Sequence, residues 1–349
     1  MNFFLTLIIS SEKNDLTTLD LNSLELINAN LDDANLVESN LSGASLNKAT
    51  LQWANLQKAN LTCAILNKAD SYKANFSGAD LSKSELSGAS FRRANLKKAN
   101  CTEANFSGAD LTSADAVEAN LGGANLSKIS LRGADFNGAN LRGVKFDGAN
   151  LSGANLSGIH CQFMNFSEAN FCGADLSKAD LRETDLTATD FRGTKLTATD
   201  FRGANLVRAN FRETNLQGLD LSEINLRGAD LCRANLCGAN LSRADLRGAN
   251  LSEANLKETN LYETNLSEAN LHKTNLSKRN FCGVNFNGTD LSEANLFQSD
   301  LSDADLRGAI LVKTDIRQTI LHRAKILFGD LRLAYYEGAD FEGAQLSRK

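Results

Sequence analysis

The residues of this sequence that could do chemistry are three histidines, seven cysteines and 42 acidic side chains. The histidines, His160, His272 and His322, could act as general bases or metal ligands, and the cysteines could supply nucleophiles or zinc ligands. The chain contains no P-loop, no dinucleotide-binding fingerprint and no zinc-ligand spacing. These histidines, cysteines and acidic residues are far apart in the sequence, so the secondary structure decides whether any of them lie close together.

A repeat of five residues determines those elements. Stepping by five from Leu16 to Leu346 gives 67 positions, here called centres, without an insertion or deletion, and 63 of them are Leu, Phe, Ile or Tyr. Two residues before each centre the chain prefers a small residue, usually Ala or Thr, and Asn or Asp lies between the two. One design thus governs nearly the whole chain.

This period excludes a helix and requires regular turns. On an α-helix of about 100° per residue, a step of five turns the side chain by about 500°, so the centres would spiral around the axis. In a strand, the centre and the small residue two before it share one face. Because five is odd, a straight strand would alternate successive centres between faces. The chain must therefore turn every five residues.

Glycine indicates where the turn lies. Of the 25 glycines, 23 lie two positions after a centre, the exceptions being Gly122 and Gly329. That preference predicts a positive φ at this corner position. Six consecutive glycine corners, from Gly133 to Gly158, form the stretch that we expect to be most pliable. The sequence also lacks proline, as expected where nearly every backbone N–H is used in stacking.

Runs such as Ala239-Asn240-Leu241-Ser242-Arg243-Ala244-Asp245-Leu246-Arg247-Gly248 resemble the pentapeptide-repeat family, whose consensus is A-(D/N)-L-x-x. The resemblance implies an all-β fold, a right-handed quadrilateral β-helix with four pentapeptides and twenty residues in each coil. We expect about seventeen coils, with residues 14–348 as one uninterrupted domain and residues 1–13 as an apolar N-terminal cap. A truncated targeting signal is the alternative for that N-terminus, although it lacks a basic region.

Placed on this solenoid, the chemical groups do not converge. The three histidines lie on separate coils, and His272 and His322 lie on different faces. Cys101 and Cys161 are centres and should be buried, whereas Cys63, Cys172, Cys232, Cys237 and Cys282 should face solvent. We therefore expect no catalytic, cofactor-binding or metal site, and no enzymatic activity. Scattered cysteines and the absence of a spanning segment favour a cytoplasmic protein.

Two places depart from the polar outward pattern. Arg279 occupies an inward, normally small position, so we expect a local bulge that releases its guanidinium. Near the C-terminus the outward positions are apolar and form the candidate partner or dimer surface: Ile310, Val312, Ile320, Leu327, Phe328, Leu333 and Tyr335. Such a cluster serves either as a cap packed by the terminal tail or as a contact patch for a second copy or another protein.

Charge separates two functional hypotheses. The net charge of −5 offers no basic field for direct nucleic acid binding. Some pentapeptide-repeat proteins resemble B-DNA in shape and charge and bind DNA gyrase, and the face of Leu21, Leu41 and Leu61 here carries a net −6. Pairs of Asp with a nearby Arg, for which we expect Asp245 with Arg247 and Asp230 with Arg233, neutralise much of that charge. We therefore favour a non-enzymatic protein-interaction scaffold of unknown partner over a gyrase-binding DNA mimic.

Overall fold

The computed structural model describes residues 15–347, so the predicted cap at residues 1–13 lies outside the described residues. The chain divides into two compact units, Met1–Asp180 and Leu181–Lys349. Both units are built from the same five-residue step, in which a turn follows the centre and a β-bridge residue precedes it, except around the 3-10 helix at residues 328–333. The repeat read from the sequence is therefore the repeat of the structure.

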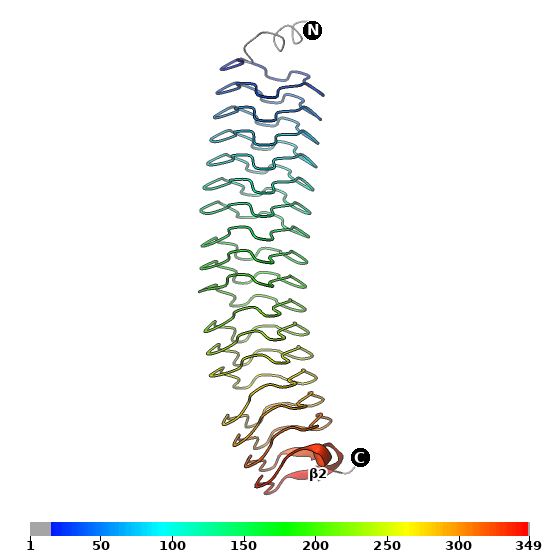
Figure 1. Cartoon of the computed structure of the whole chain (residues 1–349). Helices are drawn as coiled ribbons and strands as arrows, with labels where there is room; N and C mark the ends of the chain where they lie inside the picture. Colours follow the sequence, from blue (N-terminus) through cyan, green and yellow to red (C-terminus); the bar gives the residue numbers. More distant parts are fainter. Residues whose placement is uncertain (1–14, 348–349) are drawn as a thin grey trace. The chain divides into compact units, whose positions relative to one another are not determined.

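Within each unit, parallel bridges join residues that lie twenty positions apart. Asn35 pairs with Asn55 in the first unit, and Asn235 pairs with Asn255 in the second. Four five-residue sides therefore make one coil, and coils stack within each unit, as Figure 1 shows. The twenty-residue, four-cornered coil is confirmed. The right-handed winding and the count of seventeen coils stay predictions.

The regular elements lie at the C-terminal end. Strand β1, Lys325–Leu327, pairs in parallel with strand β2, Gln345–Ser347, so that Ile326 lies opposite Leu346. Between them, the 3-10 helix η1 spans Phe328–Leu333. Among the described residues, no helix is long and apolar enough to cross a bilayer.

The predicted corner is present in both units. The residue two positions after a centre has a positive φ whether or not it is glycine, as in Gly43 (64°), Lys58 (56°) and Phe163 (61°). The backbone N–H of this corner residue usually donates to the coil that follows, as from Lys58 to the carbonyl of Ser77 at 3.0 Å. The expectation of positive φ is confirmed, but side chains other than glycine also adopt it.

The interior is filled by the centres and by the small residues two positions before them. Leu36, Phe76 and Leu236 have no exposed surface, and neither does Ala74. Burial of each large side chain contributes about 1.5–3 kcal/mol. Where threonine takes the small position, its hydroxyl donates to a backbone carbonyl, as from Thr264 to Leu241 at 2.9 Å, so that this buried hydroxyl is satisfied.

Aromatic centres contact one another inside the solenoid, both within one coil and between neighbouring coils. Within the second unit, the rings of Phe191 and Phe211 lie 4.7 Å apart and 2° from parallel. Phe201 meets both at right angles, at 5.9 and 6.2 Å. Offset and edge-on contacts of this kind add about 0.5–1.5 kcal/mol per pair beyond burial.

The hydrogen-bond ladder between coils is interrupted in the first unit. Phe136 donates normally to Asn155, but among the described residues Leu141 and Phe146 have no backbone acceptor in the following coil. That following coil carries Ile159 and Met164 at inward positions that are usually occupied by alanine, and both are buried. Their extra volume separates the two coils locally, since a close-packed interior has little room to absorb it.

Candidate interaction surfaces

The apolar residues predicted near the C-terminus are mostly exposed. Ile310, Ile320, Leu333 and Tyr335 are 48%, 40%, 63% and 55% exposed, and Val312 is also exposed. Leu327 is partly buried in β1. The side chain of Phe328 lies outside the described residues.

These residues do not form one patch. Ile310 and Ile320 are ten residues apart, which is half of a twenty-residue coil, so they lie on opposite faces. Tyr335, bridged to Asp315, lies on a third face. The predicted cluster is therefore spread over several faces of the last coils, and the partner role of its residues stays a prediction.

A different apolar surface lies at the end of the last described coil. Its four centres, Leu331, Tyr336, Phe341 and Leu346, line a cavity of 240 Å³ together with Arg332. Tyr336 and Leu346 are 53% and 46% exposed. We call these four centres the end face. Sequence reasoning missed it because centres were assigned to the interior, although their place in the register marks them as the centres of one coil.

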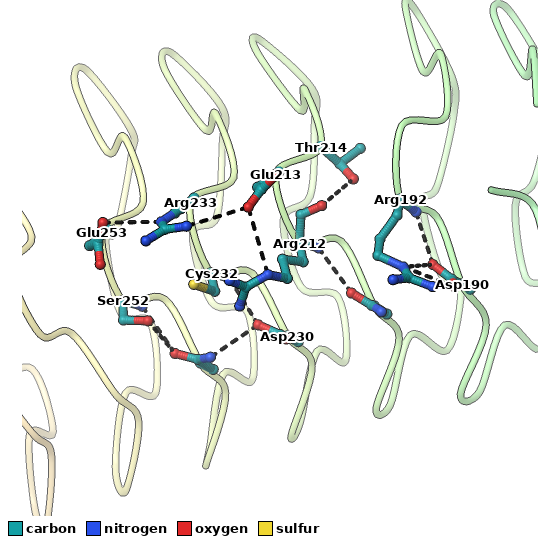
Figure 2. A network of polar contacts seen from close by, with 12 residues as sticks. Asp190, Arg192, Arg212, Glu213, Thr214, Asp230, Cys232, Arg233, Ser252 and Glu253 are labelled. Carbon is teal, nitrogen blue, oxygen red and sulfur yellow. Dashed lines mark hydrogen bonds and ion pairs between the residues drawn. The ribbon is translucent and has the colours of Figure 1, made fainter. Parts of the chain in front are cut away.

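Ladders of alternating charge follow the outward columns of the second unit. The Arg233 guanidinium lies between Glu213 and Glu253 of the neighbouring coils, at 3.6 and 3.1 Å (Figure 2). The hydrogen bond from Arg233, together with its charge, lowers the pKa of Glu253. Each carboxylate in the ladder thus has a cation within reach, so this surface alternates in sign.

The same arrangement reduces the predicted acidic face. Arg243 contacts Glu223 at 3.5 Å and Glu263 at 2.9 Å, one coil below and one above. Arg323 likewise pairs with Asp303 at 2.6 Å. Several carboxylates of this face, among them Glu223, Glu263 and Asp303, are therefore paired with arginine rather than presented as a bare row of negative charge.

In Asp-x-Arg segments the arginine contacts the aspartate two residues before it. Arg247 forms an ion pair with the Asp245 carboxylate at 2.6 Å, as expected. Arg192 forms the same kind of pair with Asp190 at 2.7 Å, as Figure 2 shows. In Asp245 the hydrogen bond from Arg247 is the main reason for a lowered pKa. The expected pair of Asp230 with Arg233 is wrong. Arg233 occupies the corner position, from which its side chain runs along the column towards the glutamates, and Asp230 accepts from the Cys232 N–H and the Asn250 amide instead.

The three histidines lie on separate coils. His160 is 3.9 Å from Asp180, and His272 Nδ1 lies 2.9 Å from the Ser292 hydroxyl. His322 Nε2 lies 2.9 Å from Asp340 and 3.9 Å from Glu342.

The His322 group is the one set of donors among the described residues that could hold a metal ion, with its ligand atoms within 4.8 Å of one another. Sequence reasoning missed it because Asp340 and Glu342 follow one coil later. Their hydrogen-bonded carboxylates raise the pKa of His322, with Asp340 the main cause. The hydrogen bond between His322 Nε2 and Asp340 accounts for this contact without an ion.

The cysteines divide by position, with one exception. Cys101 and Cys161 are buried centres, and burial raises the pKa of Cys101 to about 12 and that of Cys161 further, so neither is a thiolate at neutral pH. Cys63 and Cys282 are exposed as predicted, and Cys172 and Cys237 are intermediate. Cys232 was expected to face solvent but is 6% exposed, because it lies beside Arg212 of the neighbouring coil (Figure 2).

Arg279 does not escape through a bulge. Its coil keeps the register with the following coil, since Asn280 pairs with Asp300. Among the described residues no bridge joins Asn280 to the preceding coil, and the Arg279 side chain is partly buried. The guanidinium instead turns onto the preceding coil, where Nη1 donates to the Thr259 carbonyl at 2.7 Å and Nη2 donates to that of Leu256. Burial lowers the pKa of Arg279. The prediction assumed that a buried guanidinium needs partners, and two backbone carbonyls supply them.

Comparison with known proteins identifies the repeat. The family model described as pentapeptide repeats matches residues 25–262 and 264–335. No curated protein sequence matches the chain.

Solved structures of pentapeptide repeat proteins are similar to it. HetL, involved in heterocyst differentiation regulation in the cyanobacterium Nostoc sp. strain PCC 7120, is 27% identical over 76% of this chain and 94% of its own, with a TM-score of 0.32. QnrB1, a plasmid-mediated fluoroquinolone resistance protein, is 21% identical over 60% and 88%, with a TM-score of 0.41. Rfr23 from the cyanobacterium Cyanothece 51142 is 32% identical over 34% and 89%, with a TM-score of 0.19.

Proposed function

The chain belongs to the pentapeptide repeat family, and from this premise we propose that it is a non-enzymatic scaffold for protein–protein interaction. Two copies join through the end face, and the charged outer columns remain available to a further protein partner. In this proposal residues 14–348 act as one domain of about seventeen right-handed coils, in the cytoplasm and without a cofactor. The dispersed free cysteines support a reducing compartment.

The exposure of the end face is the observation that carries this proposal. Leu296, a centre two coils earlier, has no exposed surface, whereas Tyr336 and Leu346 expose about half of theirs. The apolar side chains of the end face surround a 240 Å³ cavity. A partner that covers them would lower the free energy by about 25 cal/mol per Å² of apolar surface buried. A two-fold contact between identical end faces is self-complementary and closes after two copies.

Self-association tests the proposal. We expect the full chain to be dimeric by light scattering and sedimentation at micromolar concentration, and the double variant Tyr336→Glu, Leu346→Glu to be monomeric because it places charge in the contact. Tyr262→Glu is the matched control, since Tyr262 is 61% exposed on a side face. A monomeric full chain, or a dimer that survives the double variant, would contradict the end-face contact.

A second candidate is a DNA-mimicking protein that binds gyrase. The net −6 on the face of Leu21, Leu41 and Leu61 favours it, and the arginine ladders on Glu223, Glu263 and Asp303 count against it. A supercoiling assay with purified gyrase separates the two. We expect neither inhibition nor quinolone protection at micromolar protein, and either effect would favour the mimic.

A further inference from the structure

A cleft opens between two coils of the second unit at Arg279. It has a volume of 630 Å³ and is lined by residues 254–259 of one coil and by residues of the next, from Lys273 to Arg279. We call it the Arg279 cleft. The coils on either side are normally bonded, as from Leu236 to Asn255 at 2.9 Å and from Leu276 to Asn295 at 2.7 Å. The opening is therefore local to the pair of coils that encloses Arg279.

The opening leaves backbone donors unpaired. In the regular ladder, the N–H groups of Leu256 and Glu258 would donate to the carbonyls of Asn275 and Ser277. Within the described residues neither N–H has an acceptor. Leu256 and Glu258 both line the cleft. Unpaired backbone N–H groups that lie beside one another favour an anionic acceptor.

The charge of the lining points the same way. Four cationic side chains, Lys257, Lys273, Lys278 and Arg279, line the cleft against the single carboxylate of Glu258. Lys257 contacts Glu258 at 3.6 Å, and Lys273 contacts Glu293 at 3.7 Å, so these two lysines are partly neutralised. Among the described residues Lys278 and Arg279 have no carboxylate within 4.0 Å.

Arg279 is the one partly buried side chain among these four cations. Its two bonds to the carbonyls of Thr259 and Leu256 supply dipoles but no negative charge. A guanidinium has five N–H donors, so three remain for another acceptor. A planar fork of donors matches the oxygens of a phosphate group, and a partly buried cation gains more from such a pair than an exposed one.

We propose that the Arg279 cleft binds a phosphate group, either free or as the monoester of a small polar molecule. Arg279 and Lys278 supply the charge, and the Leu256 and Glu258 N–H groups supply directional donors. The volume lies within the range of small-molecule sites and exceeds what the phosphate group alone would fill, so the remainder of a monoester has room. This site is separate from the end face and does not depend on the scaffold function.

The test measures binding by isothermal titration calorimetry of the full chain in chloride buffer, with inorganic phosphate and with glycerol phosphate as probes. We expect saturable binding of at least one probe. Arg279→Thr should weaken it at least tenfold, and Lys278→Ala should weaken it less. Threonine is the residue found at many equivalent inward positions, so this variant should fold, which circular dichroism would verify. Arg227→Thr, an exposed arginine outside the cleft, is the matched control and should bind as the full chain does.

The outcomes separate the sources of the phosphate. Equal affinity for both probes indicates that the phosphate group alone is recognised, and tighter binding of glycerol phosphate indicates a monoester. Absence of saturable binding of either probe at millimolar concentration overturns the proposal. So does binding that Arg279→Thr leaves unchanged, because the cation in the cleft would then play no part.

Discussion

At the scale of single residues, the corner position has the most demanding backbone. Outside η1, the described non-glycine residues there adopt a left-handed conformation, which costs about 1–2 kcal/mol relative to the right-handed one. Lysine and glutamate are frequent at these corners, as in Lys58 and Glu253. Their long side chains reach neighbours one coil away, as from Lys58 to Glu38 at 3.3 Å. The strained backbone at these corners therefore places long side chains where they can pair with residues of the neighbouring coil.

Phe163 offers a test of that strain. It has a φ of 61° and is 78% exposed, so its ring gains little from burial. We expect Phe163→Gly to raise the free energy of unfolding by about 1 kcal/mol, since glycine adopts this conformation without a Cβ penalty. Chemical denaturation would measure the change. Phe163→Ala is the control, because alanine removes the ring and keeps the Cβ, and an equal gain in both variants would refute the backbone explanation.

At the scale of the coil, stability depends on the ladder of backbone bonds, and that ladder is uneven. Leu41 and Leu46 donate to the next coil at 2.7 Å each, whereas Leu141 and Phe146 have no such acceptor among the described residues. The weak stretch lies among the six glycine corners from Gly133 to Gly158, where we expected pliability from composition. The glycine corners and the bulky inward side chains Ile159 and Met164 therefore lie in the same stretch as the missing ladder bonds.

Hydrogen exchange should reveal this difference. We expect the amides of Leu141 and Phe146 to exchange at least tenfold faster than those of Leu41 and Leu46, because an amide without a ladder bond needs no opening of the coil. Mass spectrometry of peptic peptides that cover residues 136–150 and 36–50 would measure it. Uniform protection across both peptides would show that the coils close in solution.

At the scale of the whole molecule, the period of five determined what could be predicted. It placed Leu236 inside and Gly43 at a corner, because each follows from the local path of the backbone. It could not place groups whose contacts lie one coil away. Cys232 lies beside a neighbouring coil and is buried. Arg233 pairs with glutamates twenty residues distant instead of the nearer Asp230. The end face was missed for a related reason, since a centre is buried only where another coil covers it.

The same locality predicts that the second unit can fold without the first. In a solenoid a coil contacts only its neighbours, so stability is a sum over coils and their interfaces. The second unit, residues 181–349, has its own buried centres and its own bridges from Asp185–Asn205 onwards. We expect this segment, expressed alone, to retain a β-type circular dichroism spectrum and slow exchange at Leu231, which donates to Asn250 at 2.7 Å. Its melting temperature should fall below that of the full chain, because fewer coils and fewer interfaces between coils contribute to its stability. An unfolded fragment would instead show that residues 14–348 fold as one inseparable domain.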